Sequence, residues 1–216
     1  MKSAPWPPLL MASLAGGLVY PLLWTSGLPD PAMIGLKGVG VGLLALLAAM
    51  QARSVDGWLL AAVMGFGALG DVLLDIRFEA GVVAFGVGHI VAIALYGRNR
   101  RAIVAVSQRA LAAALLLFGA AMPFLLIESG DPRLIGLVGY SLLLSAMAAM
   151  AWLSRFPRYW TGLGAVMFVV SDALIAARMG PLADAAWANW AIWLLYYLGQ
   201  LLIFIGVSAT LRRDGA

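Results

Sequence analysis

Long apolar runs, each about 20 residues, make up most of the chain and are separated by short polar or Gly/Pro-rich connections. A helix of this length crosses the hydrocarbon core of a bilayer. The runs lack the strict alternation of polar and apolar residues that a membrane β-barrel requires. With 63% hydrophobic and 11% charged residues, the chain is too apolar for a soluble globule. We therefore predict an all-α integral membrane protein.

Counting these runs predicts a single bundle of eight transmembrane helices, in one domain that fills residues 1–216. No connection exceeds about a dozen residues, which is too short for a separate soluble domain. The expected spans are 8–26, 32–51, 57–76, 80–97, 102–127, 134–153, 160–177 and 186–210. Two helix starts are signalled by Asp30-Pro31 and Asp131-Pro132, in which a capping carboxylate precedes a proline expected at the first helical position. Pro21 and Pro123 lie within spans and predict kinks there.

The basic residues separate onto alternate connections, which predicts the orientation of the chain. One side of an eight-span bundle carries ten of them: Lys2, Arg53, Arg98, Arg100, Arg101, Arg109, Arg155, Arg158, Arg212 and Arg213. The other side carries three, Arg77, Arg133 and Arg178. By the positive-inside rule, both termini are expected in the cytoplasm. Topology then accounts for the formal net charge of +4, and we expect no nucleic-acid partner.

The N-terminal segment lacks a clear small-residue cleavage site, so we expect it to stay as the first helix and not to be removed as a signal peptide. The expected location is a bacterial inner (plasma) membrane, crossed many times. Cysteine is absent, which excludes disulfides and thiolate chemistry, and we expect neither a metal nor a cofactor. Tryptophans near span ends are expected to be interfacial anchors: Trp152, Trp160, Trp187, Trp190 and Trp193.

Two carboxylates, Asp71 and Asp172, lie deep inside otherwise apolar spans. An ionised Asp at the centre of a membrane helix costs about 2.5–3.5 kcal/mol even on the mildest scale. Either residue could bridge helices or pair with a buried cation, and Lys37 is the obvious cation. Because one lysine cannot neutralise both carboxylates, we favour a functional role for the pair. We interpret Asp75, one turn after Asp71, as a solvated charge at the rim.

The predicted topology places these carboxylates at one depth. Both of their spans run outward, and Asp71 lies about 8 Å below the outer boundary at 1.5 Å per residue. Further polar side chains lie at or just below this level: Lys37, His89, Tyr140, Tyr196, Tyr197 and Gln200. Since a lone polar group facing lipid is costly, we expect them to line one chamber that opens outward. His89 is equally compatible with a proton-relay and a structural role.

Four motifs carry a resemblance to a known family: Gly70-Asp71, Gly88-His89, Ser171-Asp172 and Tyr196-Tyr197-x-x-Gln200. In this order and spacing they resemble the YhhN family of membrane proteins, which includes the lysoplasmalogenases. The resemblance runs from Lys37 to the eighth span. It implies eight helices and hydrolysis of the vinyl-ether bond of lysoplasmalogens, giving a fatty aldehyde and glycerophosphocholine or glycerophosphoethanolamine. It also implies that Asp71 and Asp172 match the family's two proposed catalytic carboxylates.

The resulting hypothesis is an ether hydrolase in which Asp71 and Asp172 act as general acid and base, in an order we leave open. The expected partners are a lysophospholipid substrate and the surrounding membrane lipids. The expected substrate-binding residues are Lys37, His89, Tyr140, Ser171, Tyr196, Tyr197 and Gln200. Two alternatives stay open: a proton-coupled transporter of small molecules or lipids, and a lipid-binding membrane protein without catalysis.

Overall fold

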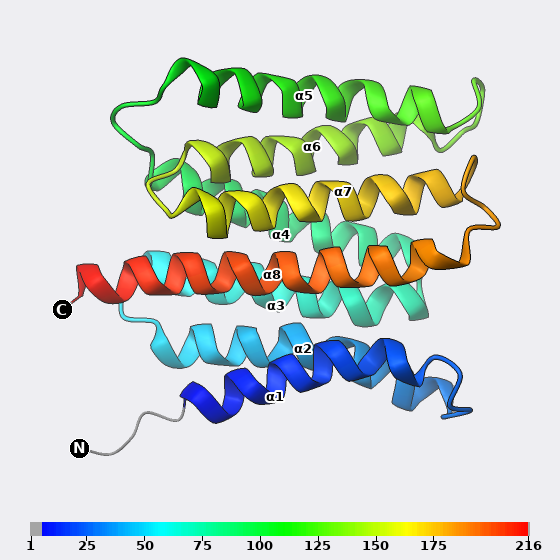
Figure 1. The fold of residues 1–216 in the computed structure, drawn as a ribbon, viewed down its shortest axis with the longest axis horizontal. Coiled ribbons are helices and arrows are strands. Elements are labelled where there is room, and N and C mark those ends of the chain that lie inside the picture. The colour runs from blue at the N-terminus through cyan, green and yellow to red at the C-terminus, as the bar shows by residue number, and fades with distance from the viewer. Residues whose placement is uncertain (1–5, 216) are drawn as a thin grey trace. The chain divides into compact units, whose positions relative to one another are not determined.

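The computed structural model describes residues 6–215 of the chain, with side chains from Pro8 onward, and in this part it forms helices and no strands. Figure 1 shows the elements in order: α1 (Trp6–Val19), the 3-10 turn η1 (Tyr20–Leu23), α2 (Asp30–Gln51), α3 (Val55–Ile76), α4 (Phe78–Arg98), α5 (Val106–Leu126), α6 (Leu134–Leu153), the π turn η2 (Arg158–Gly162), α7 (Leu163–Arg178) and α8 (Ala186–Asp214). The predicted all-α class is therefore confirmed.

Within the described residues 6–215, seven helices are long and apolar enough to cross a membrane, with η2 and α7 counted together as Arg158–Arg178. The predicted first span, 8–26, is instead a shorter apolar helix over Pro8–Leu23. It gives way to the 3-10 turn at the predicted kink, where Pro21 lies near the start of η1. The chain then turns, because Ser26 N–H bonds the Leu23 carbonyl and Gly27 has a φ of 73°. The cytoplasmic location of both termini stays a prediction, and Lys2 lies outside the described residues.

The chain divides into two compact units, residues 1–91 with 211–216, and residues 92–210. In the first unit α1 packs on α2 and α2 packs on α3, with the Ser13 hydroxyl donating to the Gly40 carbonyl at 2.6 Å. In the second unit α6 contacts both α5 and α7. The helices α4 and α8 each run from one unit into the other. The expectation of a single domain stays a prediction.

The two helix starts predicted from Asp-Pro pairs lie within two residues of the observed starts, but neither aspartate is the N-cap. The helix α2 begins at Asp30, one residue early, so its N-cap is Pro29, which makes no side-chain cap bond. The helix α6 begins at Leu134, and its N-cap is Arg133. In the turn before the helix, Asp131 accepts a hydrogen bond from the Arg133 N–H at 2.8 Å. The Arg133 guanidinium, 2.6 Å from this carboxylate, lowers the pKa of Asp131 to about 2. Asp131 thus organises the turn before α6 without being its N-cap.

Two glycines bring α7 and α8 into backbone contact in the second unit. A Cβ added at Gly164 would lie 2.5 Å from the Gly199 carbonyl oxygen, and one added at Gly199 would lie 2.7 Å from the Gly164 carbonyl oxygen. Backbone atoms cannot move aside as a side chain can. This approach of small residues holds the helix that carries Asp172 against the helix that carries Tyr196 and Gln200.

We expect Gly164→Ala to destabilise the protein. Overpacking typically costs about 1–3 kcal/mol, which exceeds the gain of up to about 1 kcal/mol in helix propensity. Gly136→Ala is the matched control, because a Cβ at Gly136 meets nothing within 4 Å. Thermal unfolding in detergent should show a lower melting temperature for Gly164→Ala and an unchanged or higher one for Gly136→Ala. Equal melting of Gly164→Ala and wild type would contradict this close packing.

Candidate functional site

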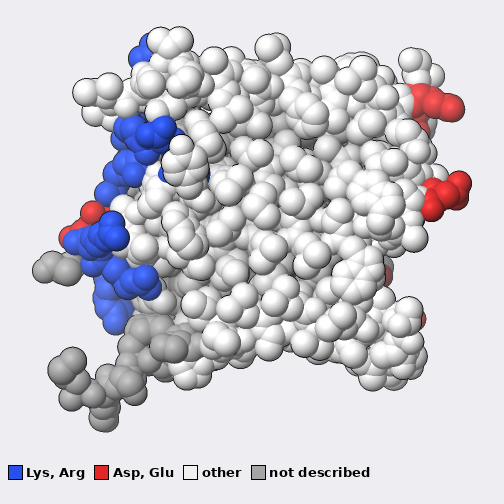
Figure 2. Space-filling view, in the orientation of Figure 1, with Lys and Arg blue, Asp and Glu red and all other residues white. Residues whose placement is uncertain are grey.

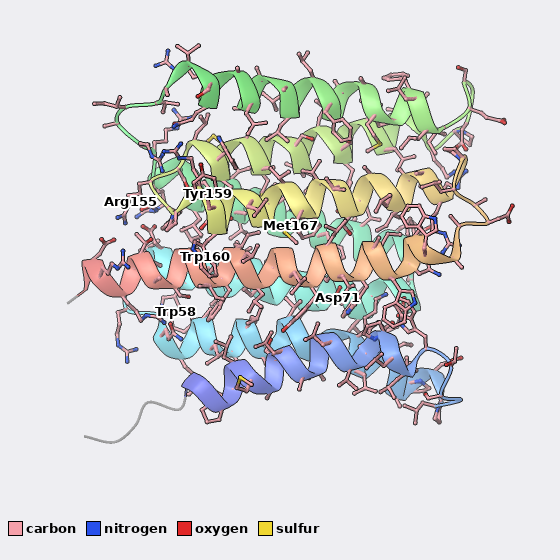
Figure 3. The ribbon with its side chains drawn as sticks, viewed as in Figure 1. Trp58, Asp71, Arg155, Tyr159, Trp160 and Met167 are labelled. Carbon is pink, nitrogen blue, oxygen red and sulfur yellow. The ribbon has the colours of Figure 1, made fainter. Side chains whose placement is uncertain are left out.

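Asp71 lies toward the C-terminal end of α3 in the first unit and is 2% exposed (Figure 3). The preceding residue, Gly70, has room for nothing larger than hydrogen, because a Cβ there would lie 2.6 Å from the Phe85 ring of α4. The ring therefore packs directly on the α3 backbone beside the carboxylate. His89 follows Phe85 by one turn, so it lies on the same side of α4, and it is 4% exposed. The first unit thus buries an acid and an imidazole on two neighbouring helices.

Lys37 of α2 forms a salt bridge with Asp75 of α3, with Nζ and Oδ1 2.6 Å apart. The two side chains are 15% and 36% exposed, so water weakens the pair, and exposed pairs of this kind contribute at most about 1 kcal/mol. The interpretation of Asp75 as a solvated rim charge was therefore incomplete. Asp75 lies at the rim but is the carboxylate that Lys37 neutralises.

Asp172 of α7 is bound to Tyr140 of α6 in the second unit. The Tyr140 hydroxyl donates to Oδ2 of Asp172 at 2.9 Å. The topology predicted from the sequence put these two side chains at a similar depth, and the structure joins them by this hydrogen bond. Among the described residues, Oδ1 of Asp172 has no hydrogen-bond partner, so one carboxylate oxygen is held and the other is available.

Ser171, the neighbour of Asp172, connects α7 to α8. Its hydroxyl donates to the Ile192 carbonyl at 2.9 Å, and the side chain is fully buried. This bond accounts for the Ser171 hydroxyl and fixes the rotation of α7, which sets the direction of Asp172. A structural role is therefore sufficient for Ser171, and its proposed contact with substrate stays a prediction.

Aromatic rings from α7 and α8 pack beneath this region. Phe168 meets Tyr196 edge to face at 5.1 Å between centroids, and Trp193 stacks on Tyr197 at 6.4 Å. The expectation that Trp193 is an interfacial anchor is wrong, because it is only 5% exposed. The sequence does contain a signal for this burial: Trp193 lies one turn before Tyr197, and residues four apart share a helix face.

Gln200 completes the set of polar residues on α8. It is 2% exposed, and its side-chain oxygen has no hydrogen-bond partner among the described residues. A buried acceptor of this kind is usually satisfied by water or by a bound molecule that carries a donor. Of the predicted binding residues, Gln200 therefore has the buried side-chain atom that most clearly lacks a hydrogen-bond partner.

The predicted site residues thus form two groups, one in each unit. Asp71, His89 and the Lys37–Asp75 pair belong to the first unit, and Asp172 with Tyr140 belongs to the second. No cluster of three or more His, Cys, Asp or Glu side chains suited to a metal ion occurs within residues 6–215. The expectation that Asp71 and Asp172 face one outward-opening chamber stays a prediction.

Apolar helices long enough to span a bilayer, with the buried ionisable side chains Asp71 and His89 inside them, define the chain as a polytopic α-helical membrane protein. More specifically, the chain belongs to the YhhN family, whose family model matches residues 32–207. Every predicted site residue falls inside this matched region. The family resemblance inferred from the sequence motifs is therefore confirmed.

Curated relatives give the family a biochemical context. A lysoplasmalogenase of Mycobacterium bovis is 33% identical over 160 residues, covering 69% of this chain and 59% of the relative. A lysoplasmalogenase of Mycobacterium tuberculosis has the same identity and coverage. The Lysoplasmalogenase TMEM86B of Sus scrofa is 32% identical over 202 residues, covering 88% of this chain and 82% of the relative. The chain therefore spans 59% of the length of its mycobacterial relatives. No solved structure matches it.

We expect Ser171→Ala to lower stability, because it removes the hydrogen bond to the Ile192 carbonyl. Hydrogen bonds between membrane helices contribute about 0.6 kcal/mol on average and at most about 1.7 kcal/mol. Reversible unfolding in mixed micelles should show a loss in this range for Ser171→Ala and none for Ser107→Ala, which alters an exposed hydroxyl at the start of α5. A large rise in KM with unchanged stability would instead make Ser171 a substrate contact.

Proposed function

We propose that this protein is a membrane-embedded, lysoplasmalogenase-like hydrolase that cleaves the vinyl-ether bond of alkenyl-glycerophosphocholine or -ethanolamine. The observation that carries the proposal is the extent of the match to a relative named lysoplasmalogenase, 88% of this chain and 82% of that protein. The family match also includes both intramembrane aspartates. The products would be a fatty aldehyde and a glycerophosphodiester.

The chemistry calls for one acid and one base. Hydrolysis of a vinyl ether begins with proton transfer to the alkene carbon that is not bonded to oxygen, which produces an oxocarbenium ion. Water attacks this cation and loses a proton, and the hemiacetal then collapses to aldehyde and alcohol. Asp71 and Asp172 would share these tasks, one protonated as general acid and the other ionised as general base, as paired carboxylates do in glycoside hydrolysis. No order between them is assigned.

The contacts of Asp172 suit such a role. The bond from Tyr140 immobilises Oδ2 at 2.9 Å, while Oδ1 has no partner among the described side chains. A carboxyl group held by one oxygen presents the other in a defined direction for proton transfer. Tyr140 would therefore act as a positioning residue for Asp172.

The remaining proposed contacts divide by chemistry. Lys37 would meet the phosphate of the head group, in competition with its 2.6 Å partner Asp75. Gln200, whose buried side-chain oxygen lacks a donor, would accept from the glycerol hydroxyl or from the attacking water. His89, Ser171, Tyr196 and Tyr197 would shape the site around them.

The decisive experiment is incubation of the purified protein with a lysoplasmalogen and measurement of released long-chain aldehyde. We expect Asp71→Asn and Asp172→Asn each to lower turnover at least about 100-fold, the lower end for loss of general acid–base catalysis. Asp184→Asn, which alters an exposed carboxylate between α7 and α8, should leave turnover unchanged. A lysolipid with a saturated alkyl ether should not react, because it has no double bond to protonate.

Three outcomes would contradict this proposal. Full activity in a folded Asp172→Asn variant would remove the two-carboxylate mechanism. Proton-driven flux of a solute into liposomes, without aldehyde release, would favour a transporter. Binding of the lysolipid without aldehyde release and without solute flux would favour a lipid-binding protein.

Replacement of Tyr140 tests the positioning role. We expect Tyr140→Phe to lower kcat about tenfold with little change in KM, because the variant frees Oδ2 of Asp172 but keeps the ring. Tyr159→Phe is the control, since Tyr159 is 79% exposed. An increase in KM at constant kcat would show that Tyr140 binds the substrate instead of orienting Asp172.

A further inference from the structure

Two connections of the second unit, far apart in sequence, are joined by backbone hydrogen bonds. The Arg101 N–H donates to the Leu153 carbonyl at 3.2 Å, and the Arg155 N–H donates to the Asn99 carbonyl at 2.7 Å. Together they form an antiparallel bridge between Arg100 and Ser154. We call residues 98–101 and 154–158 the arginine clasp. It links the end of α4 to the end of α6 (Figure 1).

Buried side chains fix the arginine clasp from within. Asn99, 4% exposed, donates to the Leu95 carbonyl at 2.9 Å and accepts from Nε of Arg155 at 2.7 Å. Arg101 donates to the Phe156 carbonyl at 3.3 Å. Phe156 itself is fully buried and packs edge to face on Tyr96 at 6.1 Å. The clasp is therefore an ordered structure and not a pair of loose charged loops.

Positive charge accumulates on the arginine clasp, whose two segments contain five arginines and no acidic residue. Residues 92–127 and 134–171 contain no Asp or Glu. Three arginines form no ion pair with any described carboxylate: Arg100, Arg101 and Arg158. Burial and the charge of Arg158 lower the pKa of Arg101. Figure 2 shows basic side chains gathered at the end of this unit where α5 begins and α6 ends. The positive-inside rule accounts for the sign of this charge, but it does not require a fixed arrangement.

We propose that the arginine clasp binds the phosphodiester head group of an anionic phospholipid, with Arg100, Arg101 and Arg158 as donors. The planar guanidinium group of arginine presents paired N–H donors that fit two phosphate oxygens at once, whereas the ammonium group of lysine does not. A lipid fits better than a soluble phosphate because the clasp lies where helices end, at the level of the head groups. Next to it, Tyr159 and Trp160 are 79% and 45% exposed (Figure 3), as expected for interfacial aromatic side chains.

Apolar side chains continue the proposed site toward the bilayer. Ile103 and Val106, between the clasp and the first turn of α5, are 86% and 82% exposed. Side chains of this kind beside a basic cluster suit the upper part of an acyl chain below its head group. This binding site is independent of the proposed hydrolase activity, because none of its residues belongs to the proposed catalytic groups.

The test compares phosphatidylglycerol with phosphatidylcholine on the purified full chain, with bound lipid measured by native mass spectrometry. We expect the wild type to bind phosphatidylglycerol at least about tenfold more tightly. The variant Arg101→Gln/Arg158→Gln should lose this preference. The variant Arg133→Gln/Arg178→Gln removes the same charge from residues already paired, with Asp131 and with Asn189, and should keep the preference. Equal affinity of the wild type for both lipids would overturn the proposal.

Two further variants separate a built site from diffuse attraction. Arg101→Lys/Arg158→Lys keeps the charge but not the guanidinium geometry, and we expect most of the preference to be lost. Asn99→Ala leaves the charge unchanged but removes a side chain that orders the clasp, and we expect it to weaken the preference for phosphatidylglycerol as well. Thermal unfolding checks that this variant is folded. Full preference in the lysine variant would overturn the proposal, as would equally strong competition by soluble glycerophosphate.

Discussion

A polar group inside the hydrocarbon core of a membrane has no water to bind, and this constraint governs the whole molecule. Backbone groups satisfy it through helices, which is why the described residues form helices and no strands. Side chains satisfy it through partners on neighbouring helices. Tyr140 meets Asp172 and Ser171 meets the Ile192 carbonyl, while at the rim Lys37 meets Asp75. Each of these three contacts joins two elements that the chain must hold in register.

The same constraint gives the proposed chemistry its setting. A carboxylate that a neighbour holds by one oxygen presents the other oxygen in a defined direction. The close backbone approach at Gly164 and Gly199 holds α7 against α8, while Ser171 fixes the rotation of α7. The direction of Asp172 thus depends on packing several residues away. At the ends of the spans the constraint relaxes, and charge accumulates in the arginine clasp, where guanidinium groups can meet lipid phosphates.

Much of the fold was predictable because hydropathy is a local property of the chain. The sixth span, expected over 134–153, is the helix Leu134–Leu153, and the other long spans differ from expectation by no more than four residues at either end. The position of each polar residue along its span predicted that Tyr140 and Asp172 lie at a similar depth, and the structure joins them by a hydrogen bond. The family also followed from the sequence, because the order and spacing of its motifs are properties of the chain itself.

Local patterns did not determine which partner each side chain would choose. Lys37 pairs with Asp75, which had been interpreted as a solvated charge, and Trp193 lies in the core against Tyr197, although its place near a span end suggested an interfacial anchor. These outcomes depend on how far each helix is rotated about its axis, and rotation is decided by packing against other helices. The sequence therefore determined which segments are long and apolar enough to cross a membrane and where along each segment its polar groups lie. Only the tertiary structure decided which of those groups meet, because contacts between helices depend on residues that are distant in the chain.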